Sequence, residues 1–183
     1  AMADVAALTG DEAYQQALNK LWEDVVFRKM YLTGGIGSTG AWEGFGPAYN
    51  LPNASAYCET CASIANAFWN YRMFLLEGEA KYLDVFERVV YNGVLSGISL
   101  SGDRFFYANP LASFGQHERT PWFGCACCPP NVARFLPQMG QYVYGTSGDR
   151  LFVNLYGSNS DQVEVKGLKV RLEQQTRYPW EGE

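Results

Sequence analysis

The cysteines of this chain fall in two tight clusters, and this pattern restricts the possible folds more than any other feature. All five lie in the segments CETC, residues 58–61, and CACC, residues 125–128. A disulfide framework spreads its cysteines along the chain. Clustered thiols in a chain without an export signal more often bind metal or take part in catalysis. The sequence therefore predicts a fold that brings the two segments together.

Four side chains in these segments could share one metal ion: Glu59, Cys61, Cys127 and Cys128. Thiolate sulfurs with one carboxylate favour zinc over magnesium or calcium. Residues two apart on a regular helix point about 200° away from each other, so Glu59 and Cys61 can share a metal only at the start of a helix. Pro129 restrains Cys128 from helical dihedrals, which permits an irregular turn at the second cluster.

A metal is not the only use for these thiols. Free cysteine often packs as a small buried hydrophobic residue, and the spacing alone leaves that alternative open for several members of the set. We assign Cys58 and Cys125 to this structural role, beside the site.

Charge and hydropathy argue against two classes of partner. The chain has a formal net charge of −5 and no cluster of lysine and arginine that could neutralise phosphates, so we expect no nucleic-acid partner. No stretch approaches the ~18 apolar residues of a membrane span, so we expect no membrane partner. The N-terminal stretch has no basic segment followed by an apolar one, as a signal peptide would have, and we expect a cytoplasmic protein.

Hydrophobic periodicity predicts a mainly α chain with a β tail. We expect helices over residues 11–31, 56–77, 79–95 and 130–143, the first with a capping box of Thr9 and Glu12 and the last broken at Pro137. Residues 100–107 are typical of a short hairpin, and alternating apolar residues after position 148 predict strands. Helices followed by strands indicate two structural units.

A glycine-rich loop over residues 32–53 carries several aromatic residues. Loops of this length in compact domains are usually functional or disordered, and the aromatic residues argue against disorder. Its GGIG segment is not expected to bind a nucleotide, because no strand precedes it and no Gly-Lys-Ser/Thr follows. Glu43 lies between Trp42 and Phe45, and a carboxyl group among aromatic rings is favoured in the protonated form that a general acid needs. An exposed loop carboxylate is the alternative.

Two further residues are candidates for substrate binding. Aromatic side chains make up 15% of the chain, and although most are expected in the core, some line clefts where sugar rings stack. Trp42 is the candidate of this kind. His117, the only histidine, could bind substrate or transfer a proton, although a lone histidine is more often structural.

The chain resembles glycoside hydrolase family 127, the β-L-arabinofuranosidases, in four segments: GGIGSTG, WEGFG, YNLPNASAYCETCA and WFGCACCPPNVARF. The tail QQTRYPWEG is similar to the family's first strands after its barrel. The resemblance implies part of an (α/α)6 barrel over residues 1–147, followed by the first strands of a β-sandwich over residues 148–183. It also implies a zinc enzyme that releases terminal β-L-arabinofuranose from an oligosaccharide or glycoconjugate with retention of configuration.

The resemblance also implies roles for individual residues. Glu43 in WEGFG matches the general acid/base, and Glu59 and Cys61 in CETC match two zinc ligands. Cys127 in CACCPPN matches a residue that is both nucleophile and zinc ligand, and Cys128 matches the fourth ligand.

Three expectations compete with or add to this interpretation. Ordinary retaining glycosidases use two carboxylates about 5 Å apart, and here these would be Glu43 as acid and Glu59 as nucleophile. A non-catalytic zinc-binding helical fragment is a second alternative. Part of a barrel also leaves helix faces uncovered, so we expect self-association through apolar stripes. These stripes include Leu18, Leu21 and Val25 on one helix and Leu83, Phe86 and Val90 on another.

Overall fold

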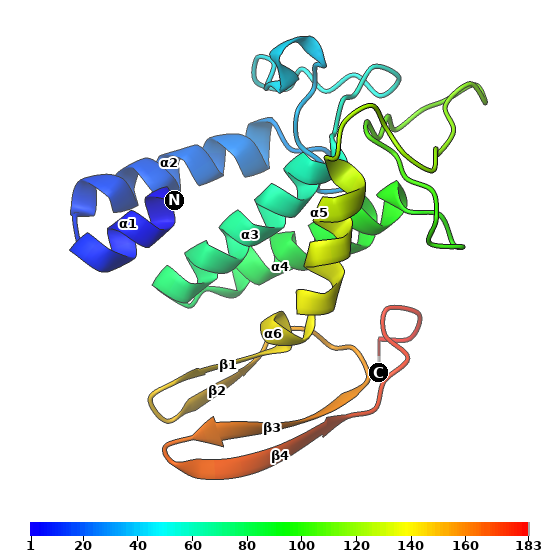
Figure 1. The fold of residues 1–183 in the computed structure, drawn as a ribbon. Helices are drawn as coiled ribbons and strands as arrows, with labels where there is room; N and C mark the ends of the chain where they lie inside the picture. The colour runs from blue at the N-terminus through cyan, green and yellow to red at the C-terminus, as the bar shows by residue number, and fades with distance from the viewer. Residues whose placement is uncertain (183) are drawn as a thin grey trace. The chain divides into compact units, whose positions relative to one another are not determined.

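The computed structural model describes residues 1–182 and divides into two compact units, Ala1–Ala133 and the chain from Arg134 onward (Figure 1). The first unit contains helices and long loops, and the second contains two antiparallel hairpins. The prediction of a mainly α chain with a β tail is confirmed at this level. The division into domains at 147/148 stays a prediction.

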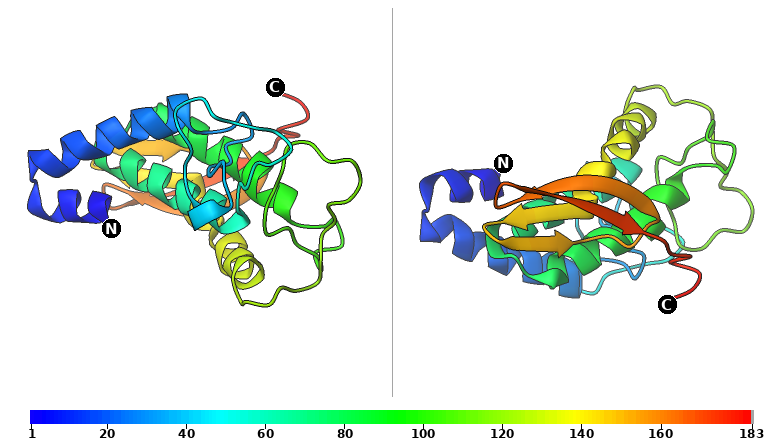
Figure 2. Two further views of the ribbon diagram at one scale, coloured as in Figure 1. Left: turned by 90° about the horizontal axis from the view of Figure 1, so that it is seen from above. Right: turned by 90° about the horizontal axis from the view of Figure 1, so that it is seen from below.

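The first unit begins with two helices that run side by side, α1 (Met2–Thr9) and α2 (Glu12–Arg28) (Figures 1 and 2). Periodicity did not predict α1, whose alanine-rich sequence favours a helix without an amphipathic pattern. The predicted capping box is wrong. Asp11 caps α2 by accepting a hydrogen bond from the Ala13 amide at 2.9 Å, whereas Thr9 ends α1 and donates to the Val5 carbonyl.

The buried face of α2 differs by one position from the predicted stripe. Leu18, Trp22 and Val25 are buried, but Leu21 is 48% exposed. Trp22 takes the inward position because its indole N–H reaches the amide of Asn70 on the next long helix.

That helix, α3 (Thr60–Glu77), packs against α4 (Ala80–Arg88). The helix predicted from residue 56 begins only at Thr60, because the chain is non-helical at Cys58 (φ 40). The helix predicted over 79–95 is α-helical only to Arg88 and continues as a π-helical turn, η2 (Val89–Val94), and a 3₁₀ turn, η3 (Leu95–Gly97).

The η2 turn lies very close to the glycine-rich loop. A Cβ atom on Gly34 would be 2.9 Å from the Cα atom of Val89, and Gly34 has a φ of 84°. Only glycine fits this position. Phe86 and Val90 are buried within the same unit and Leu83 is half-buried, so most of this second stripe is covered.

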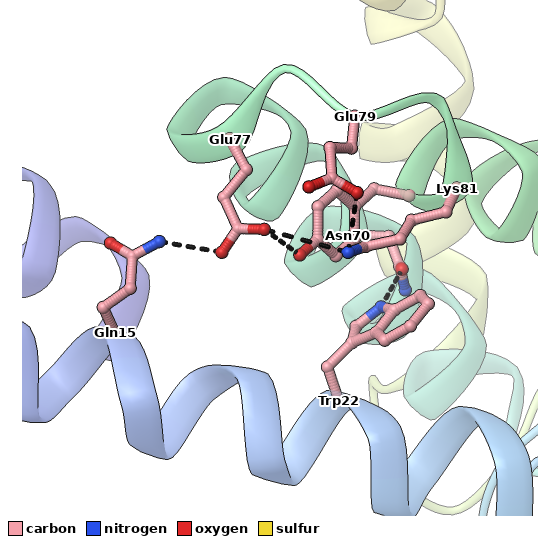
Figure 3. Close-up of polar contacts among 7 residues, drawn as sticks. Gln15, Trp22, Asn70, Glu77, Glu79 and Lys81 are labelled. Carbon is pink, nitrogen blue, oxygen red and sulfur yellow. Dashed lines mark hydrogen bonds and ion pairs between the residues drawn. The ribbon is translucent and has the colours of Figure 1, made fainter.

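A chain of buried hydrogen bonds links α2, α3 and the glycine-rich loop, and Figure 3 shows its first bond, from Trp22 to Asn70. The Trp22 indole N–H donates to Oδ1 of Asn70 at 2.7 Å, and the Asn70 amide donates to Oδ1 of Asn66 at 2.9 Å. The Asn66 amide in turn donates to the carbonyl of Gly34 at 3.2 Å. These bonds hold α3 in a defined position relative to the loop that carries Glu43.

The far end of α3 carries a second polar cluster around Glu77 (Figure 3). Its carboxylate accepts hydrogen bonds from Gln15 of α2, at 2.7 Å, and from the hydroxyl of Tyr82. Lys81 lies 3.9 Å from the same carboxylate and 2.8 Å from that of Glu79. Glu77 is the last residue of α3, whereas Asn66 and Asn70 lie in its middle.

The chain enters the second unit through α5 (Cys128–Phe135), followed by η4 (Leu136–Gln138) and α6 (Gly140–Val143). The helix predicted over 130–143 is therefore interrupted next to Pro137, as expected from the missing amide proton of proline. It begins earlier than predicted, at Cys128. Among the described residues, no helix is both long and apolar enough to cross a lipid bilayer.

Two hairpins complete the second unit (Figure 2). The strands β1 (Tyr144–Ser147) and β2 (Arg150–Val153) pair antiparallel, as do β3 (Asn159–Val165) and β4 (Leu168–Gln174). The alternating apolar residues were predicted as strands, and Val163 pairs with Val170 in the observed register. Lys166 and Gly167 both have positive φ, which is typical of a two-residue hairpin turn.

Candidate metal and catalytic site

The first half of the site is built at the N-terminus of α3. Glu59 is the N-cap residue, with φ −55° and ψ 138°, so its side chain leaves the helix in a direction that a regular helical residue could not take. This geometry satisfies the condition under which Glu59 and Cys61 can face one ion. Thr60 anchors the turn, because its amide donates to the Tyr107 carbonyl and its hydroxyl donates to the Phe106 carbonyl.

The second half lies at the start of α5. The Cys127 amide donates to the Cys125 carbonyl, and the Cys127 carbonyl accepts from the Asn131 amide in the first turn of the helix. The helix begins at Cys128, so the irregular turn ends one residue earlier than Pro129 suggested. Proline fits the first turn because an amide proton there has no partner within the helix.

These two helix starts bring three thiols and one carboxylate together. The Sγ atom of Cys61 lies 3.2 Å from that of Cys127 and 3.6 Å from that of Cys128. Oε1 of Glu59 lies 3.2 Å from the Cys127 sulfur and 3.7 Å from the Cys128 sulfur. All four ligand atoms lie within 4.8 Å of one another. The four residues predicted as a metal site are therefore neighbours in space.

The donor set fits zinc in number, type and spacing. A tetrahedral zinc with Zn–S bonds of about 2.3 Å and a Zn–O bond of about 2.0 Å holds its ligand atoms roughly 3.5–3.8 Å apart. Four of the six separations, at 3.2–3.7 Å, come within a few tenths of an ångström of that requirement, and the other two are at most 4.8 Å. Magnesium and calcium take oxygen ligands, so a donor set with three thiols does not suit either ion.

Burial disfavours the charged forms of the Cys61 and Cys128 thiols. Glu59 is 7% exposed and Cys128 is fully buried. Burial raises the pKa of the Cys61 thiol to about 11 and raises that of Cys128 well above its usual range. Thiols with raised pKa values do not ionise at neutral pH without a cation beside them. The positive ends of the α3 and α5 dipoles also favour negative charge here.

Glu43 lies in the glycine-rich loop, within the short turn η1 (Ala41–Glu43). Trp42 and Glu43 both have left-handed backbone conformations, with φ 62° and 49°, which cost roughly 1–2 kcal/mol each in a residue with a side chain. The carboxylate is exposed, and the Tyr57 hydroxyl donates to its Oε1 at 3.0 Å. The enclosure expected from the neighbouring aromatic rings is not observed, because Trp42 is 98% and Phe45 47% exposed.

Tyr57 connects this loop to the thiol cluster. Burial and the hydrogen bond to Glu43 raise the pKa of Tyr57 above its usual range, with the charge of Glu59 adding to the effect. Its ring lies 6.1 Å from that of Tyr107. A hydrogen bond to the Cys127 side chain, followed by burial, raises the pKa of Tyr107 as well. Both tyrosines therefore stay neutral and act as hydrogen-bonding groups.

The sequence motifs did not point to Tyr57, Tyr107 or Asn131. The side chain of Asn131 hydrogen-bonds to Cys61. Tyr57 immediately precedes CETC, and a tyrosine next to a metal-binding motif is the only signal that the sequence offered. The link to Tyr107 and Asn131 depends on tertiary packing.

The remaining candidates have more ordinary surroundings. His117 stacks on the Phe106 ring, and its Nε2 atom lies 2.8 Å from the Ala108 carbonyl oxygen, which anchors it within the loop. Cys58 is 2% exposed and packs with Tyr31 and Ala56, and burial raises its pKa to about 12. Cys125 is an exposed free thiol. Substrate-binding roles for Trp42 and His117 stay predictions.

Comparison with known proteins places this site in a family. The family model described as "Beta-L-arabinofuranosidase, GH127 catalytic domain" matches residues 1–141. The chain belongs to glycoside hydrolase family 127. The match includes Glu43 and both cysteine clusters, and the family resemblance predicted from the motifs is confirmed.

Individual GH127 relatives agree with this assignment. The non-reducing end β-L-arabinofuranosidase of Bifidobacterium longum subsp. longum is 37% identical over 194 residues, covering 99% of this chain and 29% of its own length. A solved GH127 β-arabinofuranosidase is 57% identical with a TM-score of 0.96, covering 98% of this chain and 28% of that one. A GH127 β-L-arabinofuranosidase from Geobacillus stearothermophilus is 47% identical with a TM-score of 0.93, covering 98% and 30%. The chain thus spans about three-tenths of the length of these relatives.

Proposed function

We propose that this chain carries the catalytic centre of a zinc-thiolate retaining glycoside hydrolase that releases terminal β-L-arabinofuranose. The observation that carries the proposal is the convergence of Glu59, Cys61, Cys127 and Cys128 at the starts of two helices. Family membership supports the substrate class. In the same proposal, the chain supplies the later part of an (α/α)6 barrel and the first strands of a β-sandwich.

The four residues of the cluster would hold the ion, and zinc bound there would supply the positive charge that keeps the thiols as thiolates. The Cys127 sulfur then attacks the anomeric carbon while the bond to the leaving oxygen breaks, and Glu43 gives that oxygen a proton. The sugar is left on Cys127 as a thioether. In the second step Glu43 takes a proton from water, the water oxygen attacks the anomeric carbon, and the Cys127 sulfur leaves with its electron pair. Two displacements retain the configuration.

The alternative with two carboxylates needs Glu59 as the nucleophile. Its Oε1 accepts from the thiols of both Cys127 and Cys128, and the residue is only 7% exposed. A carboxylate held in this way suits the role of a ligand, and a thiol in the same cluster is the better nucleophile. This arrangement supports Cys127 over Glu59.

Turnover of an aryl β-L-arabinofuranoside tests the function. NMR of the first product should show retained configuration, and Cys127→Ser should abolish turnover, whereas Cys125→Ser, an exposed thiol in the same motif, should keep it. An electrophilic arabinofuranose analogue should label Cys127. Labelling of Glu59 would favour the two-carboxylate mechanism, and zinc binding without any turnover would favour a non-catalytic fragment.

A further inference from the structure

The side chain of Glu43 makes few contacts that could fix the direction of its carboxyl group. The residue is exposed, and the flanking Trp42 is almost fully exposed. The hydrogen bond from the Glu43 amide to the Gly40 carbonyl oxygen is long, at 3.4 Å. Among the described residues, the hydrogen-bond partner of its side chain is the hydroxyl of Tyr57, at 3.0 Å.

Tyr57 is itself well placed to act as a fixed support. Its carbonyl accepts from the Asn109 amide at 2.9 Å, which ties the residue to the loop that follows η3. Its ring packs directly on the backbone of the glycine-rich loop, because a Cβ atom at Gly40 would lie 3.2 Å from the ring. Its ring centroid lies 6.1 Å from that of Tyr107, whose side chain is hydrogen-bonded to both Tyr57 and Cys127.

We infer that Tyr57 is a positioning residue that directs the acid proton of Glu43 toward the substrate. A hydroxyl that donates to Oε1 occupies that oxygen, so the proton of the neutral acid resides on Oε2. Oε2 is then the oxygen that can donate to a leaving group. This inference rests on the function proposed above, since it needs Glu43 as the acid, and it assigns no chemistry to Tyr57 itself.

Replacing the hydroxyl alone separates this role from packing. Tyr57→Phe keeps the ring that packs on Gly40 and Tyr107 but removes the hydroxyl that donates to Glu43 and is also hydrogen-bonded to Tyr107. With a substrate whose leaving group needs protonation, kcat/KM should fall by about 10-fold or more, because kcat/KM reports the first step and a misplaced general acid forfeits part of a ~10²–10⁴-fold contribution. With a dinitrophenyl leaving group, which departs without a proton, kcat/KM should change by less than about 2-fold.

Tyr31→Phe is the matched control. Tyr31 is a buried tyrosine of the same unit whose hydroxyl donates to the Pro52 carbonyl at 3.2 Å, so its loss removes a hydroxyl hydrogen bond that does not involve Glu43. The control should lower kcat/KM for neither class of leaving group. Equal losses for both leaving groups in Tyr57→Phe would overturn the inference, because a general structural defect does not distinguish them.

A second readout does not depend on turnover. In Tyr57→Phe, amide hydrogen exchange over residues 41–46 should become faster, while exchange in α3 stays unchanged. In Tyr31→Phe, exchange over residues 41–46 should stay unchanged. If the unmodified protein hydrolyses neither substrate, the proposed function has failed. The exchange measurement then still decides whether Tyr57 holds the loop, and unchanged exchange would overturn the inference.

Discussion

The Cys127 sulfur lies 3.2 Å from Oε1 of Glu59, although 68 positions separate the two residues in the chain. Each residue stands at the beginning of a helix, where the backbone is not yet regular and the unpaired amides favour negative charge. A site assembled from two helix starts can gather neighbouring residues of one motif around a single point. Regular helical segments would direct them apart.

Metal analysis is the most direct test of this arrangement. After dialysis, the purified chain should retain about one zinc, the number that a closed four-ligand site binds. Cys61→Ala and Cys128→Ala should lose the metal, since each removes a ligand from the buried cluster. Cys125→Ala should keep it, because Cys125 is an exposed thiol outside the cluster. Less than a tenth of one zinc per chain, with all thiols titrating freely, would show that the site does not form.

Removing Asn70 tests the buried amide chain. Asn70→Ala leaves the Trp22 indole N–H without its acceptor inside the core, and an unpaired buried polar group costs about 1–3 kcal/mol. Urea unfolding should therefore show a loss of at least that size. Asn92→Ala is the control, because Asn92 is exposed and its amide makes a single bond to the Arg88 carbonyl. A surface change of this kind stays within about 0.5 kcal/mol. Equal effects would mean that the buried network contributes no more than a surface bond.

The carboxyl group of Glu77 should make stability depend on pH. Burial raises its pKa, but hydrogen bonds from Tyr82, Gln15 and Asn19 and the charge of Lys81 lower it by more, so it ends below its usual range. A carboxyl group with a depressed pKa in the folded state stabilises that state above its unfolded pKa, about 4.3. This contribution is lost as the pH falls through the folded pKa.

Comparison of the native chain with Glu77→Gln isolates this effect. The difference in free energy of unfolding between the two should be largest near pH 7 and should shrink as the pH falls below about 4, where Glu77 is protonated and resembles glutamine. Unfolding curves measured at several pH values check this. A difference that stays constant with pH would contradict a depressed pKa.

Self-association is expected through the face of the first unit around α2. An apolar groove of about 350 Å³ is lined there by residues that include Leu18, Leu21, Val25, Phe45 and Trp69. Light scattering on a gel-filtration peak should show species larger than a monomer, because an uncovered apolar surface favours association. Leu21→Glu should shift the protein toward the monomer. Leu75→Glu, at a 62% exposed leucine outside the groove, should not. A native chain that stays monomeric would show that the groove does not drive association.

By itself, the sequence determined the donor set, the metal that such donors prefer and the family. Those properties depend on which residue types stand in each short motif, and motifs are local. The spacing of Glu59 and Cys61 also predicted that the two can share a metal only at the start of a helix, because the helical repeat determines where side chains two apart can point.

Only the tertiary structure decided which residues meet around these motifs. Tyr57 contacts Glu43, and Trp22 takes the buried position that periodicity assigned to Leu21. The helix after α3 changes to a π-helical turn where Gly34 approaches Val89. Each outcome depends on atoms brought together from distant parts of the chain, where close packing and the pairing of buried polar groups outweigh local propensity.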